Sequence, residues 1–437
     1  MKTRYLFPLL LLPFLSCKKD GPGIQPIDIQ VNLSYASQEL NSQLNVGDLE
    51  LKLTSEASGN TTTFKPINGV VVLSGISPGK YDIVASITIK QADYNAATGK
   101  DSPDDVTFNA SIKGQVLDHS STIELQLMAG VVGDFVIKQI YYAGSHNVDG
   151  ALFRDQFVEI YNNTDRTLYA DSLYIARTWG RQRTDASAVH YQTNGQLDWS
   201  KSVGMTMGAD ANTDYVYLRD LFMIPGNGKT YPVEPGKSIV IAQNALNHKV
   251  PFTNNNGKEV SVKNPELTVD LSKANFEVYY GDIPGEKLFA TDINNGDVPN
   301  MDIVAYDGND WILDNLGRDS YVIFKKSNRA EVTALKSYNE PLLATPSSTA
   351  KKYIQLPNDW VMDGVEAQPT LPSSRIPKKL AVSLDAGYAF VTAGSYSSQA
   401  IVRKVDKTVN GVRRLKDTNN STEDFVVIKA NPWGFAE

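Results

Sequence analysis

The stretch IDIQVNLSY, residues 27–35, indicates the fold class of the chain that follows it. Apolar residues occupy every second position of this stretch and polar residues fill the positions between them: Ile27, Ile29, Val31 and Leu33 are the apolar ones. Successive side chains of a β-strand point to opposite faces of the sheet. The period of two therefore predicts a strand with one buried face.

Further short stretches of this kind follow as far as residue 130, with turn residues between them and no helical period: LELKLTS, VVVLSG, KYDIVASITIK, VTFNASIKG and STIELQLMA. Six or seven such strands predict an antiparallel β-sandwich, which we place at 24–130. The segment GVVVLSGISPGKYDIVAS resembles prealbumin-like or carboxypeptidase-regulatory Ig-like modules of exported Bacteroidetes proteins. That resemblance implies an Ig-like fold for this part of the chain.

The first sixteen residues have the pattern of a secretion signal, because Lys2 and Arg4 precede an apolar run that only prolines interrupt. A membrane span is the alternative, but the run has about half of the ~20 apolar residues that a spanning helix needs. Cys17, the single cysteine of the chain, follows directly. Residues 14–17, FLSC, resemble the lipobox of a bacterial lipoprotein, with Phe14 where leucine is usual. The resemblance implies lipidation of Cys17, a signal peptide at 1–16 and a tether at 17–23.

Composition sets the broad class of the protein. The 437 residues are 41% apolar and 9% aromatic, enough for two substantial cores. Loss of Lys2 and Arg4 with the signal peptide would change the formal net charge from −7 to −9. An acidic chain without a basic tract argues against binding to nucleic acid. With one cysteine there is no internal disulfide, so buried apolar area must stabilise the fold.

The second domain is expected at 131–437. Four blocks in it have strand patterns with tight turns, and stretches rich in Asn, Gly, Pro and Ser separate them. We expect a core of strands that carries long insertions near 180–230, 249–300 and 327–398. The predicted fold class is therefore all-β, with two β-sandwich domains.

These blocks also carry a family resemblance. The segment QFVEIYNNTDRTLYADSLYIA resembles the opening of a lamin-tail-like domain, an Ig-type sandwich, and VEPGKSIVIAQ resembles its proline-glycine turn and following strand. Two further segments, MDIVAYDG and DSYVIFKK, resemble its central strands. The order of the blocks resembles an uncharacterised family of Bacteroidetes lipoproteins, classified as a domain of unknown function. The resemblance implies outer-membrane anchoring and a partner such as a TonB-dependent transporter.

Motifs for metals and cofactors are not found in the sequence. The four histidines, His119, His146, His190 and His248, lie far apart and none has zinc-ligand spacing. Asp and Asn residues near 162–165 and 417–424 suit turns that close on their own backbone, and calcium binding is the alternative. No phosphate-binding glycine motif occurs, so we expect no cofactor and no metal.

One local cluster departs from the acidic character of the second domain. Arg177, Trp179, Arg181 and Arg183 fall within seven residues, and Trp199 follows in the same expected insertion. Arginine forks and indole faces can bind carboxylates, phosphates or planar groups. A solvated strand end beside a core tryptophan is the structural alternative. We take the five residues as the candidate surface for a ligand or partner.

Three functions remain open from the sequence. The first is a non-catalytic outer-membrane lipoprotein that binds a small molecule or glycan, or docks on a transporter. The second is a cell-surface hydrolase acting on glycan or peptide, for which aromatic residues could form sugar-stacking platforms. The third is an adhesive or structural surface protein. We favour the first, because no assembled catalytic motif is found in the sequence.

Overall fold

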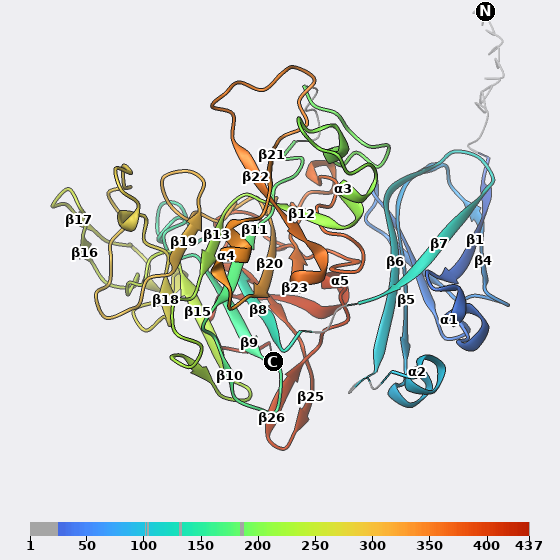
Figure 1. Cartoon of the computed structure of the whole chain (residues 1–437), viewed down its shortest axis with the longest axis horizontal. Coiled ribbons are helices and arrows are strands. Elements are labelled where there is room, and N and C mark those ends of the chain that lie inside the picture. Colours follow the sequence, from blue (N-terminus) through green and yellow to red (C-terminus); the bar gives the residue numbers. More distant parts are fainter. Residues whose placement is uncertain (1–24, 101, 103–104, 131–132, 184–187, 437) are drawn as a thin grey trace, which may run out of the picture.

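The computed structural model describes residues 25–100, 102, 105–130, 133–183 and 188–436. Cys17, the expected signal peptide and the tether lie outside these described residues. The predicted all-β class is confirmed, since strands dominate the described chain and the helices are short (Figure 1). None of the described helices is both long and apolar enough to cross a bilayer.

The N-terminal sandwich, residues 27–129, contains one seven-stranded sheet with the order β3-β2-β5-β6-β7-β1-β4. Its elements are β1 (Ile27–Tyr35), α1 (Gln38–Gln43), β2 (Glu50–Ser55), β3 (Thr61–Phe64), β4 (Val70–Ile76), β5 (Gly79–Ile89), α2 (Gln91–Thr98), β6 (Val106–Leu117) and β7 (Ser121–Ala129). The sheet folds over where Phe108 and Asn109 pair with the end of β7. Its two halves enclose one apolar core.

Strand β1 coincides with the stretch that predicted it, and Ile29 and Val31 are fully buried. The sandwich is not wholly antiparallel, because β1 pairs in parallel with β7. A parallel pair needs a long connection, and the chain between β1 and β7 is long enough to form most of the sheet.

The C-terminal sandwich, residues 135–429, packs a six-stranded sheet against a five-stranded one. The six-stranded sheet has the order β18 (Phe276–Glu277), β15 (Ser238–Ala242), β9 (Phe157–Asn162), β8 (Phe135–Tyr141), β24 (Gln399–Arg403) and β27 (Phe425–Lys429). The five-stranded sheet has the order β19 (Asp302–Ala305), β13 (Leu221–Met223), β11 (Leu173–Arg177), β20 (Ser320–Lys325) and β23 (Val361–Glu366). Their facing side chains form the largest core cluster.

A third layer covers the other face of the five-stranded sheet. It is the three-stranded sheet β12 (Tyr215–Leu218), β22 (Lys352–Pro357) and β21 (Ser337–Asn339). Tyr174 and Phe324 of the five-stranded sheet share a core with Val216 and Leu356 of this layer. Because apolar side chains are needed on both faces, β11 and β20 are continuous apolar runs rather than alternating ones.

The remaining elements are short. Three ribbons project from the sheets: β10 (Leu168–Tyr169) with β14 (Pro232–Val233), β16 (Phe252–Thr253) with β17 (Glu259–Val260), and β25 (Val405–Val409) with β26 (Val412–Leu415). The helices are η1 (Trp199–Lys201), α3 (Asp210–Thr213), η2 (Pro265–Leu267), η3 (Tyr280–Asp282), α4 (Arg329–Thr333), η4 (Asn358–Trp360), η5 (Pro372–Ser374) and α5 (Ser421–Asp424). Strands β13 and β23 fall in segments that we expected to be insertions, yet both belong to the five-stranded sheet.

The two sandwiches are in direct contact (Figure 1). Lys52 forms an ion pair with Glu423, and the amide of Asn109 donates a hydrogen bond of 2.7 Å to the carbonyl oxygen of Thr418. The Tyr388 hydroxyl donates to Asp82 at 3.2 Å. These contacts hold the N-terminal sandwich against residues 388–423 of the C-terminal one.

Candidate functional site

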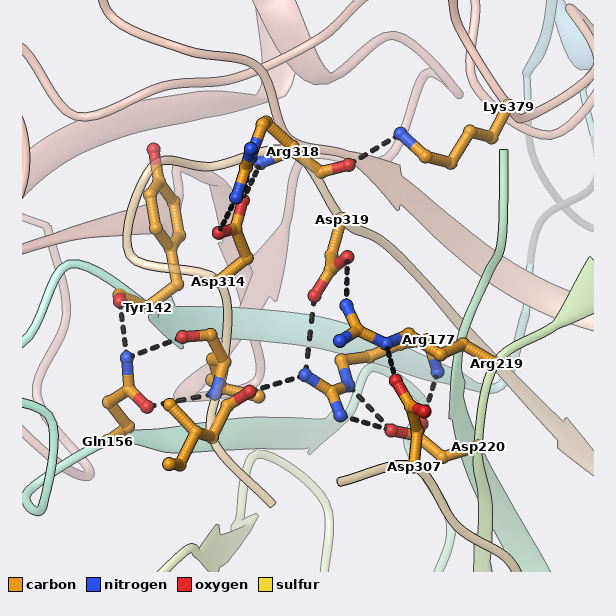
Figure 2. Close-up of polar contacts among 12 residues, drawn as sticks. Tyr142, Gln156, Arg177, Arg219, Asp220, Asp307, Asp314, Arg318, Asp319 and Lys379 are labelled. Carbon is orange, nitrogen blue, oxygen red and sulfur yellow. Dashed lines mark hydrogen bonds and ion pairs between the residues drawn. The ribbon is translucent and has the colours of Figure 1, made fainter. Parts of the chain in front are cut away.

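Arg177, the first residue of the predicted surface, is buried. It ends β11, and its side chain is 2% exposed. Its guanidinium Nε donates to Asp220 at 2.7 Å, and its Nη1 lies 3.4 Å from Asp319 (Figure 2). Burial alone would lower the pKa of Arg177, but the two carboxylates outweigh it and raise the pKa above its usual value. Arg177 is therefore a permanent cation that holds two acidic side chains in the core.

From Arg177 a chain of ion pairs runs towards the surface. Asp319 lies 3.3 Å from Arg219, which pairs with Asp307 (Figure 2). Asp307 in turn pairs with Lys351 at 2.5 Å. Side-chain exposure rises along this chain from 1% at Asp319 to 24% at Arg219 and 35% at Lys351. Burial would raise the pKa of Asp307, but Lys351 and Arg219 hold it below its usual range. The charges are thus fixed in place by one another.

Stacked aromatic rings lie beside the outer end of this chain. Trp179 stacks on Tyr353 at 4.7 Å between ring centroids, and Trp199 stacks on Tyr217 at 3.6 Å. The two stacks meet edge to face, because Trp199 lies 6.0 Å from Tyr353 at an angle of 72°. The Arg219 guanidinium lies 5.6 Å from the Trp179 ring. Trp199, Tyr217 and Tyr353 are buried, with 5%, 2% and 6% exposure, and form a small core. Trp179 is the partly exposed ring of the four, and the stacking contacts fix its orientation.

Arg181 and Arg183 lie at the rim of these rings. The Arg181 guanidinium lies 4.3 Å from the Tyr191 ring, and its Nε donates to the carbonyl oxygen of Arg183 at 2.6 Å. Arg183 is exposed. Trp179, Arg181 and Trp199 also line a small hollow of about 20 Å³, which is too small for an organic ligand.

The structure therefore brings Trp179, Trp199, Arg181 and Arg183 into one region and places Arg177 beneath it. Sequence reasoning missed the partners that orient them. We define the aromatic–ionic cluster as Trp179, Arg181, Trp199, Tyr217, Arg219, Asp307, Lys351 and Tyr353. Tyr217 lies in β12, Tyr353 in β22 and Trp199 in η1, and the other members lie in loops from several parts of the chain. No local motif signals such a grouping.

A second group of ionisable residues is enclosed in the core. Asp292 and Asp310 are 1% and 4% exposed, and burial raises the pKa of both carboxyl groups. The amide of Gln243 donates to Asp310 at 2.6 Å. Burial also raises the pKa of nearby Glu277 to about 7. Raised carboxyl pKa values often mark active sites, but these groups lie behind packed side chains and are not accessible to a substrate.

The Asp- and Asn-rich turns are occupied by protein groups. The side-chain oxygen of Asn162 accepts from the amide of Thr164 at 2.9 Å. Asp417 and Asp424 lie 3.1 Å and 3.3 Å from the buried guanidinium of Arg403. Among the described residues, no three His, Cys, Asp or Glu side chains are grouped so that they could hold a metal ion.

Comparison with known proteins shows similarity to a family without an assigned function. Residues 234–432 match the model of the family described as "Protein of unknown function (DUF4876)". The crystal structure of a DUF4876 family protein from Bacteroides thetaiotaomicron is similar over 94% of this chain and 98% of that one, with 25% identity and a TM-score of 0.51. The match supports a relation to an uncharacterised family found in Bacteroides. The family model begins at Glu234. The segment of residues 156–176, which resembles a lamin-tail domain, therefore lies outside the part of the chain that the family model matches.

More distant structures share little with the chain. A DUF3823 family protein from Bacteroides ovatus covers 50% of this chain and 98% of its own length, with 14% identity and a TM-score of 0.14. A streptococcal ancillary pilin covers 57% of this chain and 62% of its own, with 9% identity and a TM-score of 0.15. None of the curated proteins compared matches the chain.

Proposed function

We propose that this protein is a non-catalytic lipoprotein, anchored in the outer membrane through Cys17, that docks on a neighbouring membrane protein through the aromatic–ionic cluster. The anchor follows from the lipobox-like residues 14–17, and two or more acyl chains would hold the chain firmly. The docking role is carried by one observation. The ion pairs that start at buried Arg177 end at partly exposed Lys351, beside the stacked rings of Trp179 and Tyr353.

The composition of the cluster suits a protein partner. Tryptophan, tyrosine and arginine dominate the residues that contribute most to protein–protein binding. Trp179 and Arg181 are the partly exposed members of these types, and buried Trp199, Tyr217 and Tyr353 support them from below. Because the rings are already stacked and the charges already paired, binding would immobilise few free side chains. Rigid side chains of this kind favour specific docking over loose adhesion.

Charges of both signs at the surface point to a partner with complementary charges. Lys351 and Arg183 are cationic, while Asp307 and Glu340 lie close by, and the indole of Trp179 donates to Glu340 at 3.4 Å. Such a mixture fixes the orientation of a partner. A transporter of the outer membrane, such as a TonB-dependent one, would lie in the same bilayer as the lipid anchor.

The test is co-purification from detergent-solubilised envelopes. The double variant Arg181→Ala with Arg183→Ala removes two rim cations without touching the buried ion pairs. We expect the amount of the co-purified membrane protein to fall at least tenfold. Lys258→Ala, in the exposed turn between β16 and β17, is the matched control and should leave it unchanged.

Equal capture by the double variant and the control would contradict docking at the cluster. Circular dichroism and thermal melting of both variants would establish that each is folded. Enzymatic turnover that is lost with a defined pocket residue would instead favour the hydrolase alternative.

A further inference from the structure

A separate hollow lies where the β10–β14 ribbon approaches the edge of the six-stranded sheet. Its volume is about 310 Å³, and its lining includes Tyr231, Glu234, Lys237, Asn275 and Phe276. That volume is at the lower end of the range for small-molecule sites. None of these lining residues belongs to the aromatic–ionic cluster.

A tight turn places two opposite charges at this hollow. The amide of Lys237 donates to the carbonyl oxygen of Glu234 at 3.0 Å, and Gly236 between them has φ +74°. Pro235 followed by glycine with positive φ is the pattern of a type II turn. The first and last residues of such a turn lie close together, so the carboxylate of Glu234 and the ammonium of Lys237 share one rim.

Both charged side chains are exposed. The Glu234 carboxylate accepts from the Thr167 hydroxyl at 2.9 Å and retains further acceptor capacity. Within the part of the chain that the structure describes, the Lys237 ammonium forms no ion pair or hydrogen bond, so its three donors are available to a ligand.

The wall of the hollow is aromatic and rigid. Tyr231 packs edge to face on Phe276, with 4.9 Å between ring centroids and an angle of 77°. Phe276 is buried, whereas Tyr231 is only partly so. Asn275 at the edge is held by its Oδ1, which accepts from the amide of Val240 at 2.9 Å. An immobile ring with polar groups on either side is ready to receive a ligand without rearrangement.

We propose that this hollow binds one neutral sugar ring of a glycan. The apolar C–H face of the sugar would pack on Tyr231, while its hydroxyls bond to Glu234, Lys237 and the Asn275 amide. Opposite charges on one rim favour a neutral ligand, because Glu234 disfavours an anion and Lys237 disfavours a cation. A sugar hydroxyl both donates and accepts, so it satisfies both groups.

This site is independent of the proposed docking function, and either can fail alone. The test is saturation-transfer NMR on the full chain with maltohexaose, cellohexaose and xylohexaose as probes. We expect at least one probe to receive saturation at its ring protons. Tyr231→Ala should weaken its affinity at least tenfold, whereas Tyr231→Phe, which keeps the ring, should change it less than twofold.

Two further variants distinguish a loss of binding from a loss of folding. Glu234→Gln keeps the shape of an exposed side chain and should weaken binding at least threefold. Tyr81→Ala, at a half-buried tyrosine of the N-terminal sandwich, should have no effect. The proposal is overturned if no probe binds, if binding survives both Tyr231→Ala and Glu234→Gln, or if an extended peptide binds in place of the sugars.

Discussion

Replacement of Arg177 by methionine should destabilise the C-terminal sandwich strongly. The change leaves Asp220 and Asp319, at 0% and 1% side-chain exposure, without their shared cation. Removal of one partner from a buried ion pair costs about 3–5 kcal/mol. We expect a value near the lower end, because Asp319 keeps Arg219 at 3.3 Å while Asp220 loses its guanidinium partner.

Tryptophan fluorescence in urea is the assay. All five tryptophans lie in the C-terminal sandwich or its loops, so the signal reports on the unit that contains Arg177. Arg166→Ala is the matched control, because its ion pair with Asp134 is 63% and 44% exposed and should contribute at most about 1 kcal/mol.

A second variant separates lost charge pairing from lost packing. In Arg177→Met with Asp220→Asn, the uncompensated buried charge is gone, so we expect at least half of the lost stability to return. A loss below about 1 kcal/mol for Arg177→Met, or further destabilisation by Asp220→Asn, would refute the ion-pair account.

Three further predictions concern groups outside the aromatic–ionic cluster. Asp310→Asn should stabilise the protein by about 1–3 kcal/mol at pH 8. Burial raises the pKa of Asp310 in the folded state, so the wild type loses stability as the pH rises through that folded-state pKa, and the variant does not. Urea denaturation of both proteins at pH 5 and pH 8 measures the difference. His248→Gln should remove up to about 3 kcal/mol of acid sensitivity between pH 6.5 and 4, because burial lowers the pKa of His248 to about 4 and the unfolded chain takes up a proton first. Urea midpoints of wild type and variant across this range check it, and an equal or greater acid sensitivity of the variant would contradict it. Cys17→Ser should move the protein from the membrane to the soluble fraction, and an unmodified Cys17 thiol in the mature wild type, seen by mass spectrometry, would exclude the anchor.

The sequence was most informative about strands that bury one face. The alternation in residues 27–35 predicted β1, because side-chain burial there follows the period of a strand. Strands β13 and β23 were not recognised, since both lie within stretches rich in turn residues and gain their pairing from distant strands.

The candidate site could be predicted only in part, because most of the residues that bury or orient its side chains are distant in sequence. Four of the five residues proposed from sequence lie in one region, but Arg177 is buried by Asp220 and Asp319, which are 43 and 142 residues away. Tyr353, which stacks on Trp179, lies far along the chain, whereas Tyr217, which stacks on Trp199, is nearer in sequence but belongs to a strand that the sequence pattern did not predict. Local composition identifies such side chains, whereas only the fold shows which of them reach the surface.

Site-specific photocrosslinking in intact cells tests the docking claim most directly. A photoreactive residue at position 183, at the rim of the aromatic–ionic cluster, should crosslink to one outer-membrane protein in high yield, and the same residue at position 258 should not. Equal yields at both positions, or no adduct at position 183, would contradict the assignment of the cluster as the docking surface.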